Sequence, residues 1–216
     1  MKALSLSLPI RLSLIFSLLL LIIISICPAG FVSSDLQSTA QQHLPLSPSS
    51  TKVFSFNNTD GSITNNTFFS TFQNINALGM MIKYPNNWKT VQADNSALIL
   101  MPPLDRDNFS ENLIIAVFGI NNSININQLS DRAIKNYGAY YNDFYILNLK
   151  PIFIQGKSAY LLLYTYTSPT AGEIFTMNIG IKDGSKAYVI SYSAEQQEYH
   201  SYLSIIEKMI DSFHLV

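Results

Sequence analysis

Three histidines are the first residues to consider for hydrolytic chemistry, because a histidine beside a serine or cysteine can activate it as a nucleophile. His43 lies in a Ser- and Pro-rich stretch, His200 is in a predicted helix, and His214 is two residues from the C-terminus. No Gly-x-Ser-x-Gly motif surrounds any serine. The sequence therefore predicts that the protein is not an enzyme.

Glu195, Glu198 and His200 form a first group of metal-ligand types. On a helix these positions are i, i+3 and i+5, which do not converge on one ion, so a solvated helix face is the better interpretation. Glycine-rich phosphate loops and dinucleotide fingerprints are absent from the sequence. We predict no cofactor and no metal site of this type.

An acidic loop offers a second group, with Asp105, Asp107, Asn108 and Glu111 within seven residues. Carboxylate and amide oxygens are the ligands that Ca²⁺ prefers in proteins. The loop lacks the glycine turn and the spacing to a bidentate glutamate that define an EF-hand. Weak Ca²⁺ binding at Asp105 and Asp107 is left open.

The charge balance argues against nucleic-acid binding. Charged residues make up 12% of the chain, with 13 basic and 14 acidic side chains. Without Lys2 and Arg11 near the N-terminus, 13 − 2 = 11 basic residues remain against 14 acidic ones, a net charge of −3. Because no cluster of lysine or arginine is left to neutralise phosphates, the predicted partner is not a nucleic acid.

Residues 1–32 are predicted to be a signal peptide or an N-terminal membrane anchor. Lys2 and Arg11 precede an uncharged, mainly apolar run from Leu12 to Val32. Such a run either starts export or spans a bilayer, and the preceding positive charges place the rest of the chain outside the cytoplasm. Cys27, the only cysteine, lies in this run, so the fold has no intramolecular disulfide.

Residues 33–67 are rich in Ser, Thr, Asn and Pro and are predicted to be a linker, with a folded domain over 68–216. Four triplets match the N-glycosylation acceptor pattern Asn-x-Ser/Thr. They begin at Asn57, Asn65, Asn108 and Asn121. Chance accounts for some triplets in so Asn-rich a chain, but their placement in predicted linkers and loops fits an exported protein.

The domain is predicted to be strand-rich with two helices. Alternation and apolar runs predict strands at residues 96–101, 113–120, 144–150, 151–154, 158–167, 173–182 and 186–193. Asp183-Gly184-Ser185 predicts a hairpin, and Gly156-Lys157 a turn. Asn125 with Gln128, and Ser193 with Gln196, resemble capping boxes at the starts of the two helices.

Tyrosines cluster near the end of the first predicted helix, at positions 137, 140, 141 and 145. Amphipathic rings of this kind are enriched at protein interfaces, but they also fill cores. The sequence favours packing in the core and leaves an interface as the alternative.

Residues 78–88 predict a strand, a turn and an anchoring indole, with Gly79, Tyr84, Pro85 and Trp88 as its structural motif. This motif, followed by Gly-x-x-Ala-Tyr at 156–160, Ala-Tyr-x-Ile-x-Tyr-x-Ala at 187–194 and Tyr-Leu-x-x-Ile at 202–206, resembles the PsbP-like family, which includes an extrinsic subunit of photosystem II. The resemblance implies a central antiparallel sheet flanked by helices, and a role in binding or assembly.

The predicted fold class is α+β, a central, mainly antiparallel sheet flanked by helices in an α/β/α sandwich. The predicted function is an exported binding or assembly module at the outer face of the cytoplasmic membrane, whose partner is an unidentified protein. The N-terminal segment would tether it to the membrane if uncleaved. The alternative is a carrier of small ligands or lipids, with a pocket between sheet and helix lined by Tyr and Met.

Overall fold

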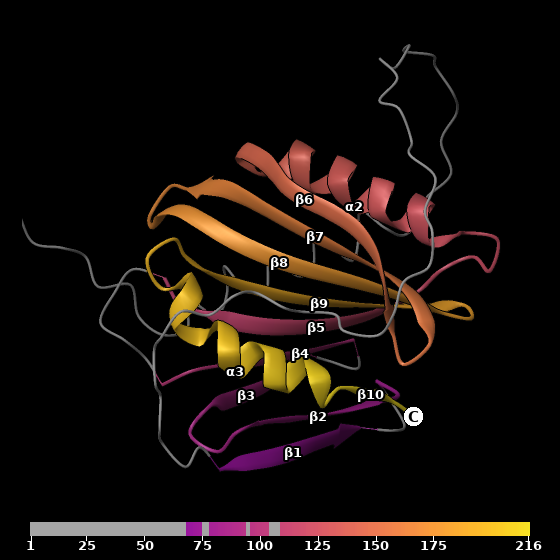
Figure 1. Ribbon diagram of the computed structural model, residues 1–216, viewed down its shortest axis with the longest axis horizontal. Coiled ribbons are helices and arrows are strands. Elements are labelled where there is room, and N and C mark those ends of the chain that lie inside the picture. Colours follow the sequence, from indigo (N-terminus) through magenta and orange to yellow (C-terminus); the bar gives the residue numbers. More distant parts are fainter. Residues whose placement is uncertain (1–67, 75–77, 94–95, 104–108) are drawn as a thin grey trace, which may run out of the picture.

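The computed structural model describes residues 68–74, 78–93, 96–103 and 109–216 (Figure 1). The predicted leader (1–32), the linker (33–67) and the acidic positions 105, 107 and 108 lie outside the described residues. The strands are β1 (Phe69–Asn74), β2 (Met80–Pro85), β3 (Lys89–Ala93), β4 (Ala97–Met101), β5 (Asn112–Gly119), β6 (Asn142–Ile154), β7 (Lys157–Ser168), β8 (Gly172–Asp183), β9 (Lys186–Glu195) and β10 (His214–Leu215). The helices are α2 (Ile126–Tyr140) and α3 (Tyr199–Asp211).

The described part is mostly antiparallel β-sheet with two helices, in agreement with the predicted mainly antiparallel sheet. The larger sheet has seven strands in the order β3-β4-β5-β9-β8-β7-β6, so β3 and β6 are its edges. A smaller sheet has the order β1-β2-β10 and brings the end of the chain beside β2. Figure 1 shows β1 and β6 at opposite ends of the molecule.

The central strands of the larger sheet are covered on both faces, as the alternation along β7 predicts. Tyr160 and Leu162 belong to one hydrophobic cluster, which includes residues of α2. Ala159 and Leu161 belong to the other cluster, which includes residues of α3 and of β2. Because successive strand residues point to opposite faces, the two helices pack on opposite sides of the sheet. The side with α3 is shared with the smaller sheet, so that layer is not made of helix alone.

The two predicted helix starts have different outcomes. The Asn125–Gln128 capping box at the start of α2 is confirmed, since each side chain accepts a hydrogen bond from the other residue's backbone N–H at 2.9 Å. The predicted cap at Ser193 is wrong, because β9 continues through Glu195, which pairs with β8. Helix α3 begins six residues later, with Glu198 as its N-cap and no side-chain capping bond.

The predicted hairpin at Gly184 is confirmed, and this glycine has φ +56°, a conformation that other residues adopt at a cost. The turn between β6 and β7 lies at Gln155-Gly156, both with positive φ, one residue before the predicted position. The two strands predicted at 144–150 and 151–154 are one strand, β6. Pro151 does not break it because edge strands tolerate a residue without an N–H.

The predicted structural motif lies at the junction of the two sheets. Gly79 has φ +65° directly before β2, and the Trp88 N–H donates to the Pro85 carbonyl at 2.9 Å to close the turn before β3. The Trp88 ring is buried in the larger hydrophobic cluster and meets the Tyr202 ring edge-on, with ring centres 6.0 Å apart. Tyr84 packs against the same cluster. The motif therefore joins the smaller sheet to the core.

Candidate functional site

The residues considered for metal binding do not form a ligand group in the described structure. His200 is exposed on the first turn of α3, and Tyr199 beside it is buried. Glu111 is buried at the start of β5, whereas the other residues of the predicted Ca²⁺ loop lie outside the described part. Among the described residues no three His, Cys, Asp or Glu side chains are grouped as metal ligands.

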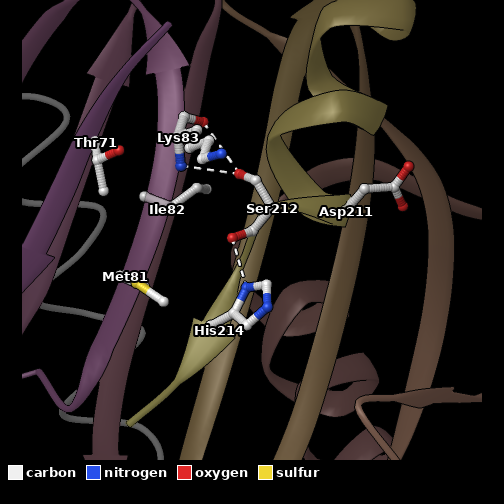
Figure 2. Close-up of a pocket in the computed structure, with 7 residues that line it drawn as sticks. All are labelled: Thr71, Met81, Ile82, Lys83, Asp211, Ser212 and His214. Carbon is white, nitrogen blue, oxygen red and sulfur yellow. Dashed lines mark hydrogen bonds between the residues drawn. The ribbon is translucent and has the colours of Figure 1, made fainter.

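One pocket lies between β1, β2 and the end of α3, with a volume of about 380 Å³. Figure 2 shows its lining, which consists of Thr71, Met81, Ile82, Lys83, Asp211, Ser212 and His214. The pocket brings Asp, Ser and His side chains into one place, the residue types of a hydrolytic triad. Their hydrogen bonds decide whether they could act together.

The hydroxyl of Ser212 is committed to the backbone around it. The Lys83 N–H donates to Ser212 Oγ at 2.8 Å, and Oγ donates to the Met209 carbonyl at 2.7 Å. His214 Nδ1 lies 2.8 Å from the Ser212 carbonyl oxygen rather than from its hydroxyl, and the Asp211 carboxylate points away from both (Figure 2). A triad needs the base at the nucleophile's hydroxyl. Here Ser212 instead fastens the end of α3 to β2.

The tyrosines near the end of α2 divide into a buried and an exposed group. We call Tyr137, Tyr141, Tyr164 and Tyr166 the tyrosine cluster. Tyr137 is 4% exposed and stacks on Tyr164 with ring centres 5.1 Å apart, and Tyr141 stacks on Tyr166 at 3.9 Å. Tyr140 and Tyr145 are exposed. The core interpretation is therefore confirmed for Tyr137. Tyr140 and Tyr145 lie at the surface, and their place in an interface stays a prediction.

A polar side chain on β8 organises the core beside this cluster. Asn178 is fully buried, accepts a hydrogen bond from the Tyr160 hydroxyl at 3.1 Å and donates to the Tyr137 hydroxyl at 3.0 Å. It also donates to Ser191 Oγ at 2.6 Å. Because buried polar groups cost free energy unless they are paired, this network fixes the position of α2 on the sheet.

Burial has a direct electrostatic consequence for these hydroxyls. It raises the pKa of Tyr137 well above its usual range, although the hydrogen bond with Asn178 lowers it in part. Burial likewise raises the pKa values of Tyr160 and Tyr164, and the neighbouring tyrosines raise them further. A tyrosine that acts as a general base or nucleophile needs a lowered pKa. Their burial and packing make these rings part of the core.

The edge strand β6 carries an exposed apolar surface. We define the β6 surface by the side chains of Tyr145, Ile146, Leu147, Leu149 and Phe153, which are between 36% and 66% exposed. Most apolar side chains of the other strands are buried, so this concentration on one strand is unusual for the molecule. Exposed apolar side chains that are concentrated on one element mark interaction sites in soluble domains. The β6 surface is the candidate functional site.

A family model described as PsbP-like protein matches residues 15–215. The chain belongs to the PsbP-like family. The resemblance predicted from the sequence is thus confirmed. A comparison with the curated proteins found no match.

Solved structures share the fold of this PsbP-like chain at low sequence identity. The solution structure of cyanobacterial PsbP from Synechocystis sp. PCC 6803 has a TM-score of 0.55 and 16% identity, over 74% of this chain and 99% of that one. The Ran-binding protein Mog1p of Saccharomyces cerevisiae has a TM-score of 0.50 and 11% identity, over 70% and 97%. LpqN of Mycobacterium tuberculosis, involved in cell envelope biogenesis, has a TM-score of 0.51 and 9% identity, over 70% and 86%.

Two parts of the site in this PsbP-like chain were not identified from the sequence. The run Phe144–Leu149 has no charged residue and four successive apolar side chains, which suggests a strand covered on both faces rather than an exposed edge. Asn178 lies between the apolar residues Met177 and Ile179 in its strand. A polar residue in a strand covered on both faces was the available signal for a buried network.

Two further predictions concern the glycosylation triplets and the membrane anchor. Asn121 lies exposed in the loop before α2, where its side-chain oxygen accepts hydrogen bonds from the Ser123 N–H and hydroxyl, both at 3.0 Å. The triplets at 57, 65 and 108 begin outside the described residues. No helix in the described ranges is long and apolar enough to span a membrane, and the predicted anchor at 1–32 is outside them.

Proposed function

We propose that this PsbP-like protein is an exported, non-catalytic module that binds a protein partner through the β6 surface at the outer face of the cytoplasmic membrane. The observation that carries the proposal is the exposure of five apolar side chains on one edge strand. Aromatic and aliphatic side chains of this kind form the centres of protein interfaces, where their burial contributes most of the binding free energy.

The family and the fold support binding over chemistry. Mog1p, a Ran-binding protein, shows that this fold can bind a protein, and LpqN is involved in cell envelope biogenesis. In this chain the one Ser-His-Asp grouping described above has its serine hydroxyl bound to backbone groups. Export rests on the uncharged run after Arg11 and on the acceptor triplets.

The carrier alternative has less support. It predicts a pocket lined by Tyr and Met, between sheet and helix. The pocket of Figure 2 contains one methionine and no tyrosine, and its lining includes Lys83 and Asp211. The tyrosines beneath α2 pack on one another instead, with ring centres as close as 3.9 Å.

Site-specific photocrosslinking in the native cell tests the proposed binding surface. A photoreactive residue at Leu147 should give a discrete crosslinked product in the membrane fraction. The matched control is Phe68, which is 73% exposed and should give none. It directly precedes β1, which lies at the opposite end of the molecule from β6 (Figure 1). Equal labelling from both positions, or none from Leu147, would contradict the proposal.

Export is tested separately from binding. Mass spectrometry of the mature protein should find it outside the cytoplasm, with its leader either intact as an anchor or removed. If the host modifies exported proteins, Asn121→Gln should remove one glycan, because Asn121 is exposed and its triplet lies in a loop. Recovery of the protein in the cytoplasm with a complete N-terminus would refute this part of the proposal.

A further inference from the structure

The β6 strand has an acidic residue at one end of an uncharged segment and a basic residue at the other. In two antiparallel copies, each acidic end would face a basic end. Asp143 and Lys150 bracket six residues, Phe144–Leu149, without a charged side chain. Because β6 is the last strand of the seven-stranded sheet, one of its edges has no neighbouring strand within the described residues. An open edge of a sheet can pair with a strand of another chain.

If two β6 edges pair antiparallel, opposite charges face each other and apolar side chains face apolar side chains. With the two-fold axis between Ile146 and Leu147, Asp143 of each copy lies opposite Lys150 of the other. The same register sets Phe144 opposite Leu149 and Ile146 opposite Leu147. Opposite charges and apolar pairs at facing positions both stabilise strand pairing, and a two-fold axis makes each contact occur twice. A parallel arrangement would set like charges side by side.

We propose that a second copy of this chain docks antiparallel on the β6 edge, through the segment from Asp143 to Lys150. The inference rests on the proposed function, because it names a partner for the β6 surface. Side chains stand roughly perpendicular to a sheet, so edge pairing leaves Leu149 and Phe153 of both copies exposed on one continuous face. The dimer thus brings exposed apolar side chains of two copies together on one face, where a further partner could bind.

Other features of β6 keep the pairing short. Pro151 has no N–H to donate, so it ends the ladder on one side. The register with β7 shifts between Asn142 and Tyr145 and again between Ile146 and Asn148, and Leu147 has no partner residue in β7. Both shifts lie inside the proposed segment, and the bends that they introduce into β6 discourage association along a longer edge. The predicted contact is therefore a short ladder with a fixed register, rather than an open aggregate.

Engineered cysteines test the register in the full-length chain. Two differently tagged proteins, one with Tyr145→Cys and one with Asn148→Cys, are mixed in mild detergent in a Cys27→Ser background. These two positions face each other in the proposed dimer, so oxidation should give mainly the mixed-tag disulfide. Phe68→Cys replaces either partner as the control. A mixed-tag yield no higher than with Phe68→Cys would overturn the inference.

Charge exchange tests the proposed ion pairs. Lys150→Asp or Asp143→Lys alone should lower the mixed-tag yield roughly three- to tenfold, since each dimer loses two opposite-charge pairs. The double exchange should restore it. Asp143 has φ +51°, which strains a lysine there, so thermal melting of each variant confirms that it is folded. Failure of the folded double exchange to restore the yield would overturn the inference.

The two proposals fail in distinguishable ways. If no dimer forms but Leu147 still crosslinks to another protein, the proposed function stands and the second copy is rejected. If the only product from Leu147 has the mass of two copies of this chain, the second copy is supported and a separate partner at this surface is rejected.

Discussion

The tyrosine cluster and the β6 surface lie on neighbouring elements and are built from similar residues, yet the first is largely buried and the second is exposed. Tyr141 stacks on Tyr166 beneath α2, whereas Tyr145, four residues later, is 66% exposed. The difference comes from coverage. Helix α2 packs on β7 and β8 and on part of β6, but most side chains of this edge strand are exposed. Composition alone therefore does not separate a core from a binding surface in this protein.

Alkaline pH should produce the largest difference between the two regions. Burial raises the pKa values of Tyr137, Tyr160 and Tyr164 in the folded protein. Their stabilising contribution is complete below the unfolded-state value of about 10 and is lost as the pH rises above it toward the folded-state values. Each such tyrosine lowers the free energy of unfolding by about 1.4 kcal/mol per pH unit in that range.

The measurement is tyrosinate absorbance together with circular dichroism across the alkaline range. Ionisation of the buried tyrosines should coincide with loss of secondary structure. Tyr145→Phe is the control and should leave that transition in place, because its ring is exposed outside the cluster. Ionisation of all tyrosines while the fold persists would show that the cluster is open to solvent.

Tyr164→Ala should have the next largest effect. Tyr164 is 3% exposed and its ring contacts those of Tyr137, Tyr141 and Phe144. Removing a buried aromatic ring leaves a cavity and costs about 3–5 kcal/mol of the free energy of unfolding. Denaturant unfolding measures this cost. Tyr145→Ala, the matched exposed change, should stay within about 0.5 kcal/mol. Equal losses in the two variants would remove the distinction between the regions.

Gly180→Ala should have an intermediate effect on the same core. A Cβ atom at this position would lie 2.2 Å from the Tyr160 ring, and the ring cannot move freely because Asn178 holds its hydroxyl. Overpacking of this kind costs about 1–3 kcal/mol. Gly119→Ala is the control, since nothing lies within 4 Å of its added Cβ.

A second variant identifies the cause of the Gly180→Ala effect. If the clash with the ring is responsible, Gly180→Ala combined with Tyr160→Leu should be less destabilising than the sum of the two single changes. Additive costs would instead place the strain in the backbone of β8.

Much of this fold could be predicted from the sequence because its signals are local. The Asn125–Gln128 cap, the Gly184 hairpin and the alternation along β7 each depend on residues within a few positions of one another. The start of α3 was predicted too early because Ser193 and Gln196 match a capping pattern, but pairing with β8 keeps that segment in a strand. Long-range pairing overrides a local signal there.

The candidate site could not be predicted in the same way. Whether Tyr145 or Leu147 is exposed depends on the order of strands in the sheet, which places β6 at an edge. The separation of Ser212 Oγ from the His214 ring likewise depends on β2, which is distant in sequence and donates the Lys83 N–H to that hydroxyl. The residue types draw attention to the β6 side chains and to the Ser212 and His214 pair. Only the tertiary contacts show that the first form a surface rather than a core, and that the second fastens a helix end rather than forming a catalytic triad.

A substitution at the centre of the β6 surface should have the smallest effect on stability. It tests most directly whether this surface is exposed while the neighbouring core is buried. Leu147 is 48% exposed and has no partner residue in β7, so Leu147→Ser should change the free energy of unfolding by no more than about 0.5 kcal/mol. It should nevertheless reduce binding of a hydrophobic dye to the folded protein, because it removes part of the exposed apolar area. Leu162→Ser, on the neighbouring strand but fully buried, should be strongly destabilising. A large loss of stability in Leu147→Ser would mean that β6 is covered in the folded protein, and the binding surface would then have to lie elsewhere.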